Sequence, residues 1–154
     1  MITFLWCAAG SPEPTITDNP FTDIDPNAYY FKAVLWAVEK GITKGATETT
    51  FDPDGTVNRG QTVTFIYRDS LSSSHKEFPT EQSSGTTPLR AAGGEPVDSE
   101  INFKDLDPGQ YYMDAVKWAV ANGITKGTVE DTFSPNDECT RGQIVTLLFR
   151  YYAA

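Results

Sequence analysis

Residues 21–69 read FTDIDPNAYYFKAVLWAVEKGITKGATETTFDPDGTVNRGQTVTFIYRD, and residues 103–151 read FKDLDPGQYYMDAVKWAVANGITKGTVEDTFSPNDECTRGQIVTLLFRY. The two stretches align without a gap at a constant offset of 82, and 26 of the 49 aligned positions are identical. Structural repeats usually bury their apolar faces only against neighbouring repeats. The sequence therefore predicts a fold built from copies of one unit, with its functional surfaces between the copies.

A partial copy opens the chain ahead of these two full copies. Ile2 to Trp6, ITFLW, aligns with Val63 to Tyr67 of the first full copy at an offset of 61. The alignment predicts that the chain begins with the second helix of a repeat whose first helix is missing. The predicted organisation is a remnant helix at 1–10, a connector at 11–20, a repeat at 21–70, a Ser/Gly/Pro-rich linker or loop at 71–100 and a repeat at 101–154.

Each full copy predicts an amphipathic first helix. Apolar residues recur at the i, i+3, i+4, i+7 and i+8 spacing of one buried helical face, at Tyr30, Ala33, Val34, Ala37 and Val38 and again 82 positions later. Gly41 and Gly123 follow the last turn, where glycine commonly forms a left-handed cap without steric cost. The two helices are predicted to end at Lys40 and Asn122.

A capping box opens the second helix of each full copy. In Thr140-Arg141-Gly142-Gln143 the threonine hydroxyl and the glutamine side chain can bond reciprocally to backbone amides, and Asn58-Arg59-Gly60-Gln61 has the same design. The residues that follow are apolar around much of the helix circumference. Such a helix is expected to be surrounded by others, so the three second helices predict a central bundle.

Composition and charge exclude several classes of function. The formal net charge of −9 argues against nucleic acid, whose binding needs a basic surface. No run approaches the ~20 apolar residues of a membrane span. The single histidine, His75, lies in the polar linker, and no His, Cys or carboxylate cluster has the spacing of a catalytic or metal site. We therefore expect no enzyme activity, no metal and no cofactor.

Five short motifs recur in the same order in both full copies, and together they resemble the S-layer homology family. They are an aromatic-x-Asp start, an aromatic-rich first helix, a Gly-Ile-x-x-Gly turn, a Thr-Phe-x-Pro segment and a counterpart of the family's Thr-Arg-Ala-Glu motif. The resemblance implies a mainly α-helical pseudo-trimer with a central three-helix bundle and helix-turn-helix lobes, the first lobe being truncated. It also implies grooves between the lobes.

The resemblance further implies a non-catalytic module at the bacterial cell surface that anchors its protein to the cell wall. Its partner would be an anionic, pyruvylated secondary cell-wall polysaccharide bound in the inter-repeat grooves, with the motif arginines, Arg59 and Arg141, meeting the acid. An arginine beside the free amides of a helix N-terminus independently suits a carboxylate. The further candidate ligand contacts are Trp36, Trp118, Lys44, Lys126, Gln61 and Gln143.

Structural alternatives stand beside each of these assignments. The arginines could instead pair with Asp23 or Asp105, the two tryptophans could belong to the core, and the lysines could simply be solvated. The whole chain could likewise be a protein-interaction module or a purely structural one. Finally, the truncated lobe predicts an open apolar flank on the bundle, through which the chain could self-associate.

Overall fold

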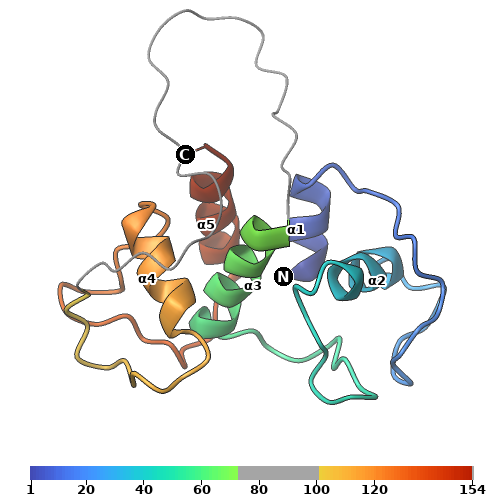
Figure 1. The fold of residues 1–154 in the computed structure, drawn as a ribbon, viewed down its shortest axis with the longest axis horizontal. Helices are drawn as coiled ribbons and strands as arrows, with labels where there is room; N and C mark the ends of the chain where they lie inside the picture. The colour runs from blue at the N-terminus through green and yellow to red at the C-terminus, as the bar shows by residue number, and fades with distance from the viewer. Residues whose placement is uncertain (73–100, 154) are drawn as a thin grey trace, which may run out of the picture.

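The computed structural model of the protein describes residues 1–72 and 101–153, which contain five helices (Figure 1). Only two isolated β-bridges occur in these ranges, so the described residues contain no strand. The prediction of a mainly α-helical fold is confirmed. The helices are α1 (Ile2–Ala8), α2 (Phe31–Glu39), α3 (Arg59–Ser72), α4 (Met113–Ala121) and α5 (Arg141–Ala153).

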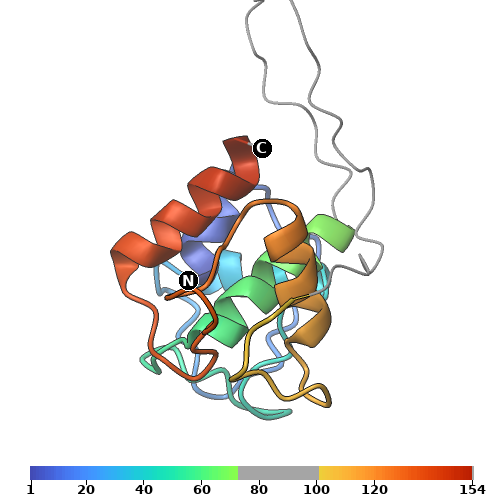
Figure 2. The same ribbon diagram turned by 90° about the vertical axis from the view of Figure 1, so that its left-hand side faces the viewer.

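The second helices of the copies, α1, α3 and α5, form the centre of the molecule (Figures 1 and 2). Helix α5 packs against both α1 and α3. Leu5, Ile66 and Leu148 occupy equivalent positions in the three copies, and all three side chains are buried in one hydrophobic cluster. The predicted central bundle is therefore present, and the partial copy contributes α1 to it.

The first helices of the two full copies lie on opposite sides of this bundle (Figure 1). Helix α2 packs against α1, and α4 packs against α3. Each lobe therefore covers the second helix of the copy before it in the chain. The contact between α4 and α3 includes the rings of Trp118 and Tyr67, whose centroids are 5.4 Å apart.

The outer helices end where the glycine signals predicted. Lys40 and Asn122 are the C-caps of α2 and α4, and the following Gly41 and Gly123 have φ values of +68° and +69°. The Ile42 amide donates to the carbonyl of Ala37 at 2.8 Å, which is the long bond of a Schellman cap. These caps turn the chain sharply into the lobe.

Both capping boxes at the start of the central helices are formed as predicted. The amide of Gln61 donates to Oδ1 of Asn58 at 2.8 Å, and the amide of Asn58 donates to Oε1 of Gln61 at 3.0 Å. Thr140 and Gln143 form the same reciprocal pair at 2.9 and 3.3 Å. The arginine that follows each cap residue therefore occupies a fixed position in the first helical turn.

A buried polar contact joins α3 to α5. Asp69 is completely buried, and its carboxylate accepts a hydrogen bond from the hydroxyl of Tyr151 at 3.1 Å. The two residues occupy equivalent positions in the two full copies, 82 residues apart. Because a buried carboxylate without a partner would be costly, this bond helps to specify how the two central helices meet.

The polar stretch at 71–100 only partly enters the described structure. Helix α3 continues through Ser72, two residues beyond the repeat boundary expected at residue 70. The remainder of the expected linker or loop, residues 73–100, lies outside the described residues.

Candidate functional site

An aspartate holds the Thr-Phe-x-Pro loop of each lobe. The carboxylate of Asp23 accepts hydrogen bonds from the backbone amides of Phe51 at 2.9 Å and Asp52 at 2.8 Å. Asp105 binds the two amides 82 positions later in the same way, at 2.9 and 2.6 Å. Asp23 and Asp105, which the sequence offered as partners of the motif arginines, therefore bind loop amides. The aspartate of the aromatic-x-Asp motif thus holds the Thr-Phe-x-Pro loop of its own lobe in place.

These amide bonds predict a pH dependence of stability. They lower the pKa of the Asp23 carboxyl below its ordinary value of 3.8. A carboxylate with a lowered folded-state pKa stabilises the fold fully above its unfolded pKa, and this contribution is lost as the pH falls through the folded pKa. We therefore expect wild type to lose stability below about pH 4 more steeply than Asp23→Asn. Urea unfolding between pH 2.5 and 6 measures this, and parallel curves for the two proteins would contradict it.

Arg59 is buried at the boundary between the two full copies, with 6% of its surface exposed. Its Nε donates to the carbonyl oxygen of Phe133 at 2.8 Å, and its guanidinium carbon lies 4.9 Å from the centroid of the Phe133 ring. The Arg59 amide donates to the carbonyl of Asp137 at 2.9 Å. The start of α3 therefore docks onto the Thr-Phe-x-Pro loop of the following copy.

This docking fixes the orientation of the guanidinium. Within residues 1–72 and 101–153, no buried side-chain nitrogen lacks a hydrogen-bond partner. The hydrogen bond of the Arg59 side chain uses Nε, so the two terminal nitrogens lie at the small exposed part of the residue. The ring and the carbonyl of Phe133 thus hold the Arg59 side chain from one side. The two terminal guanidinium nitrogens remain able to bind a ligand from the other side.

Arg141 has the same local sequence but a different environment. It is exposed at the start of α5, where no described loop covers it. Burial, and after it the positive charge of Arg141, lower the pKa of the Met1 amino group. The two motif arginines are therefore not equivalent, because only Arg59 is covered by a following copy.

The other candidate contacts divide between core and surface. Trp36 and Trp118 are both buried in the main hydrophobic cluster, where the Trp118 ring contacts Tyr67 and Tyr151. Both indole rings therefore belong to the hydrophobic core. The exposed candidate residues are better placed than these tryptophans to contact a sugar. Those exposed residues are Lys44, Lys126 and Gln143, whereas Gln61 is half-buried.

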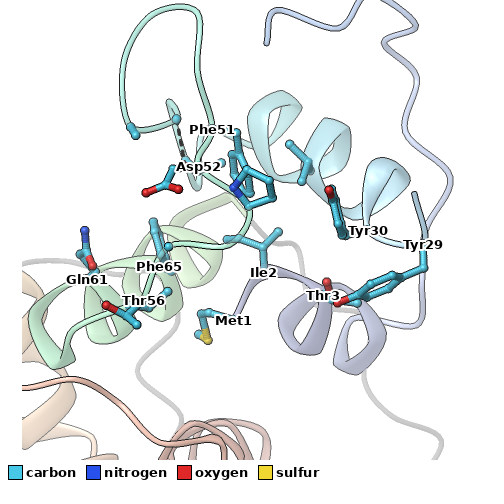
Figure 3. A pocket seen from close by; sticks show the side chains of 17 residues that line it. Met1, Ile2, Thr3, Tyr29, Tyr30, Phe51, Asp52, Thr56, Gln61 and Phe65 are labelled. Atoms are coloured by element: carbon cyan, nitrogen blue, oxygen red, sulfur yellow. Dashed lines mark hydrogen bonds between the residues drawn. The ribbon is translucent and has the colours of Figure 1, made fainter. Parts of the chain in front are cut away.

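A pocket of about 210 Å³ lies between the partial copy and the first full copy. Figure 3 shows Thr3 of α1 and Tyr29 at one end, Gln61 and Phe65 of α3 at the other, and Phe51 on the wall between them. Thr43 and Gly45, which flank Lys44, also line it. The pocket lies between copies, where the resemblance implies a groove.

Two exposed tyrosines at the copy boundaries were missed in the sequence. In each Tyr-Tyr pair the second residue contributes to the helix face, and only that residue was assigned a role. The first residues, Tyr29 and Tyr111, are exposed, and each ring lies edge-on to its neighbour at 5.1 or 5.2 Å. Tyr29 lines the pocket. Identity of both tyrosines across the copies was the signal that could have found them.

No group of three or more His, Cys, Asp and Glu side chains among the described residues is arranged to hold a metal ion. None of the described helices has the length and apolar character needed to cross a membrane.

Comparison with known families agrees with this architecture. The model of the S-layer homology domain matches residues 20–63 and 102–145, which together make up more than half of the chain. The chain belongs to the S-layer homology family. Both matched segments begin at the aromatic-x-Asp loop and end inside the central helix of their copy. The resemblance inferred from the motifs is confirmed, and S-layer homology modules are cell-surface modules.

Curated relatives contain this module within much longer proteins. The surface-layer 125 kDa protein of Lysinibacillus sphaericus is 28% identical over 84% of this chain, which corresponds to 9% of that protein. A cell surface protein of Thermoanaerobacter kivui is 25% identical over 86% of the chain and 15% of its own length. An endoglucanase of Bacillus sp. strain KSM-635 is 25% identical over 94% of the chain and 13% of its own length. The chain thus spans no more than 15% of the length of these three relatives.

Proposed function

We propose that this S-layer homology module attaches its protein noncovalently to an anionic, pyruvylated secondary cell-wall polysaccharide. The site is the boundary between the two full copies, where Arg59 is held against Phe133. The observation that carries the proposal is the orientation of this arginine, whose Nε is bound to the Phe133 carbonyl while its terminal nitrogens reach the surface.

The chemistry of the guanidinium suits the acid group of such a polymer. Two parallel N–H donors match a carboxylate bidentately, and these charge-assisted bonds are about twice as strong as neutral ones. A rigidly held arginine also loses little conformational entropy when a ligand binds. A pyruvate ketal presents one carboxylate on a sugar. The two terminal nitrogens of the guanidinium can bind that carboxylate together.

The equivalence of the two copies suggests Lys126 as a second positive group for this site. Lys126 lies between Thr125 and Gly127, the counterparts of Thr43 and Gly45, which line the pocket of the first full copy. The Lys126 side chain is exposed and makes no ion pair with a described residue. Because the chain carries a net charge of −9, an anionic polymer should bind only where such cations are concentrated.

Binding to purified wall polysaccharide tests the proposal directly. The protein should be retained on polymer that carries its pyruvate groups and should lose most of that affinity when the groups are removed chemically. Raising the salt concentration should weaken binding, since the contact is between charges. Equal retention on both polymers would refute a carboxylate site, and absence of binding to any wall preparation would favour the protein-interaction alternative.

The module itself is proposed to be non-catalytic. Two of the matching relatives have the names of enzymes, the endoglucanase already mentioned and an amylopullulanase of Thermoanaerobacterium thermosulfurigenes. The chain corresponds to only 13% and 6% of those proteins, respectively. Attachment to the wall, as distinct from the chemistry of an enzyme, is the activity we assign to this segment.

Self-association is the second proposed interaction, and it concerns the α5 flank, formed by Val145 and Phe149. These two side chains are 51% and 70% exposed, whereas their counterparts on α3 are covered by α4, Val63 being 1% exposed. No described helix covers the α5 flank in the way that α2 covers α1 and α4 covers α3. An apolar patch of this kind favours a partner, here a second copy.

We therefore expect the protein to dimerise reversibly as its concentration rises. Phe149→Ser should shift the dimer dissociation constant upward by about 10-fold, since it removes the most exposed aromatic ring of the α5 flank. Tyr29→Ser, which removes another exposed ring away from the α5 flank, serves as the control. Sedimentation velocity across the micromolar range measures both, and a monomer at every concentration would contradict the proposal.

A further inference from the structure

The connector at residues 11–20 is held beside α2 by two polar contacts, one near each end of the helix. The Lys32 ammonium forms an ion pair with the Glu13 carboxylate at 2.7 Å. The Glu39 carboxylate accepts a hydrogen bond from the Thr15 amide at 2.6 Å, and this amide holds the pKa of the Glu39 carboxyl below its ordinary value of 4.5. An exposed ion pair contributes little, whereas a carboxylate bound to a backbone amide belongs to the stronger class of hydrogen bonds.

Both contacts belong to one stripe of α2, which we call the outer stripe. It consists of Lys32, Leu35 and Glu39, whose i, i+3 and i+7 spacing places them on one face of the helix. Leu35, in the middle of this stripe, is only 3% exposed, yet it belongs to neither hydrophobic cluster of the described residues. Pro14 lies between the two connector residues that are bound at the ends of the stripe, and it is half-buried. The two contacts therefore place the connector over Leu35.

The equivalent stripe of the second full copy has a different chemistry. Over their nine residues α2 and α4 differ at four positions. Three of these differences fall on the stripe, where α4 has Asp114, Lys117 and Ala121 in place of lysine, leucine and glutamate. Both helices pack against a central helix, α2 on α1 and α4 on α3. The residues of the outer stripe are therefore not required for that packing, and they match the connector instead.

We infer that the outer stripe is a docking face for a peptide segment, and that its partner is this chain's own connector at residues 12–16. The lysine of the stripe meets a glutamate, the leucine is covered by a proline, and the glutamate binds a backbone amide. The docked segment is also tied to α1, because the indole Nε1 of Trp6 donates a hydrogen bond to the carbonyl oxygen of Pro12 at 2.8 Å. Since the docked connector lies outside the central bundle, it should open and close as a local unit.

An exchange of the stripe residues in the full chain tests this inference. The triple variant Lys32→Asp, Leu35→Lys, Glu39→Ala gives α2 the three stripe residues of α4, which a helix in the same packing already accommodates. Phe31→Met, the remaining difference between the two helices, is the matched control. Leu35→Lys alone leaves both polar contacts in place and tests the apolar part of the docking face. Hydrogen exchange followed by NMR measures the protection of the Thr15 amide in each protein.

The Thr15 amide should exchange at least about 10-fold faster in the triple variant than in wild type, because its carboxylate partner is removed. Leu35→Lys should accelerate this exchange by about 3-fold or more, and Phe31→Met by less than about 2-fold. Amides inside α3 and α5 should keep their wild-type protection in all three variants. An unchanged Thr15 rate in the triple variant or in Leu35→Lys would overturn the inference, as would an equal loss of protection in α3 and α5.

Discussion

Replacing Gly127 with alanine is expected to lower the free energy of unfolding by about 2–5 kcal/mol. Gly127 has a φ of +89°, where side chains are rarely accommodated. A Cβ atom there would lie 2.6 Å from the carbonyl oxygen of Thr132 and 2.6 Å from the ring of Phe103. The backbone penalty and the steric overlap both oppose the substitution, and neither contact can move without disturbing the lobe.

Gly123→Ala is the matched control within the same turn. Gly123 also has a positive φ, +69°, but its added Cβ would meet no atom within 4 Å. The free energy of unfolding of this variant should therefore fall by only about 1–2 kcal/mol, the cost of a side chain at a positive φ. Urea unfolding followed by circular dichroism gives both values, and equal losses for the two variants would show that the overlap at Gly127 is relieved at no cost.

The Gly127 variant should also weaken the proposed ligand site. The ring of Phe103, which the new Cβ would strike, packs against Phe133 with centroids 5.9 Å apart. Phe133 in turn supports the guanidinium of Arg59. We therefore expect a shift of the Phe103 ring to move the Phe133 ring, and the Phe133 ring to move the guanidinium of Arg59.

Local signals in the sequence were sufficient for the helices and their ends. A capping box involves residues three apart, and a glycine cap needs only a positive φ, so both follow from a few neighbouring letters. The equivalent core positions Leu5, Ile66 and Leu148 likewise follow from the alignment of the copies. These features are confirmed because the physical cause of each lies within one helix or one repeat.

The environment of each candidate residue depended on chain neighbours that the local sequence does not specify. Arg59 and Arg141 follow the same kind of cap and precede the same Gly-Gln, yet one is buried and the other exposed. The difference arises because a following copy covers the start of α3 and no described copy covers the start of α5. Similarly, the sequence predicted α4 but not that it packs on the helix of the preceding copy.

Arg59→Lys is expected to weaken binding to the pyruvylated polymer by at least about 30-fold. Lysine keeps the charge, but it offers a single ammonium in place of a planar fork that can bind the Phe133 carbonyl and a carboxylate at once. Its loss of stability should be about 1–3 kcal/mol, because the stacking on Phe133 and one buried hydrogen bond are removed.

Two controls separate the binding effect from the loss of stability. Arg141→Lys changes the equivalent motif position but at an exposed site, so its stability should change by less than about 0.5 kcal/mol and its binding only slightly. Asp69→Asn should lose stability to a similar extent as Arg59→Lys, since its buried bond to Tyr151 is weakened, while the arginine remains in place. Titration calorimetry with the polymer and urea unfolding provide the two measurements. Wild-type affinity in Arg59→Lys would show that the ligand does not use the fork, and loss of affinity in Arg141→Lys instead would move the site to the start of α5.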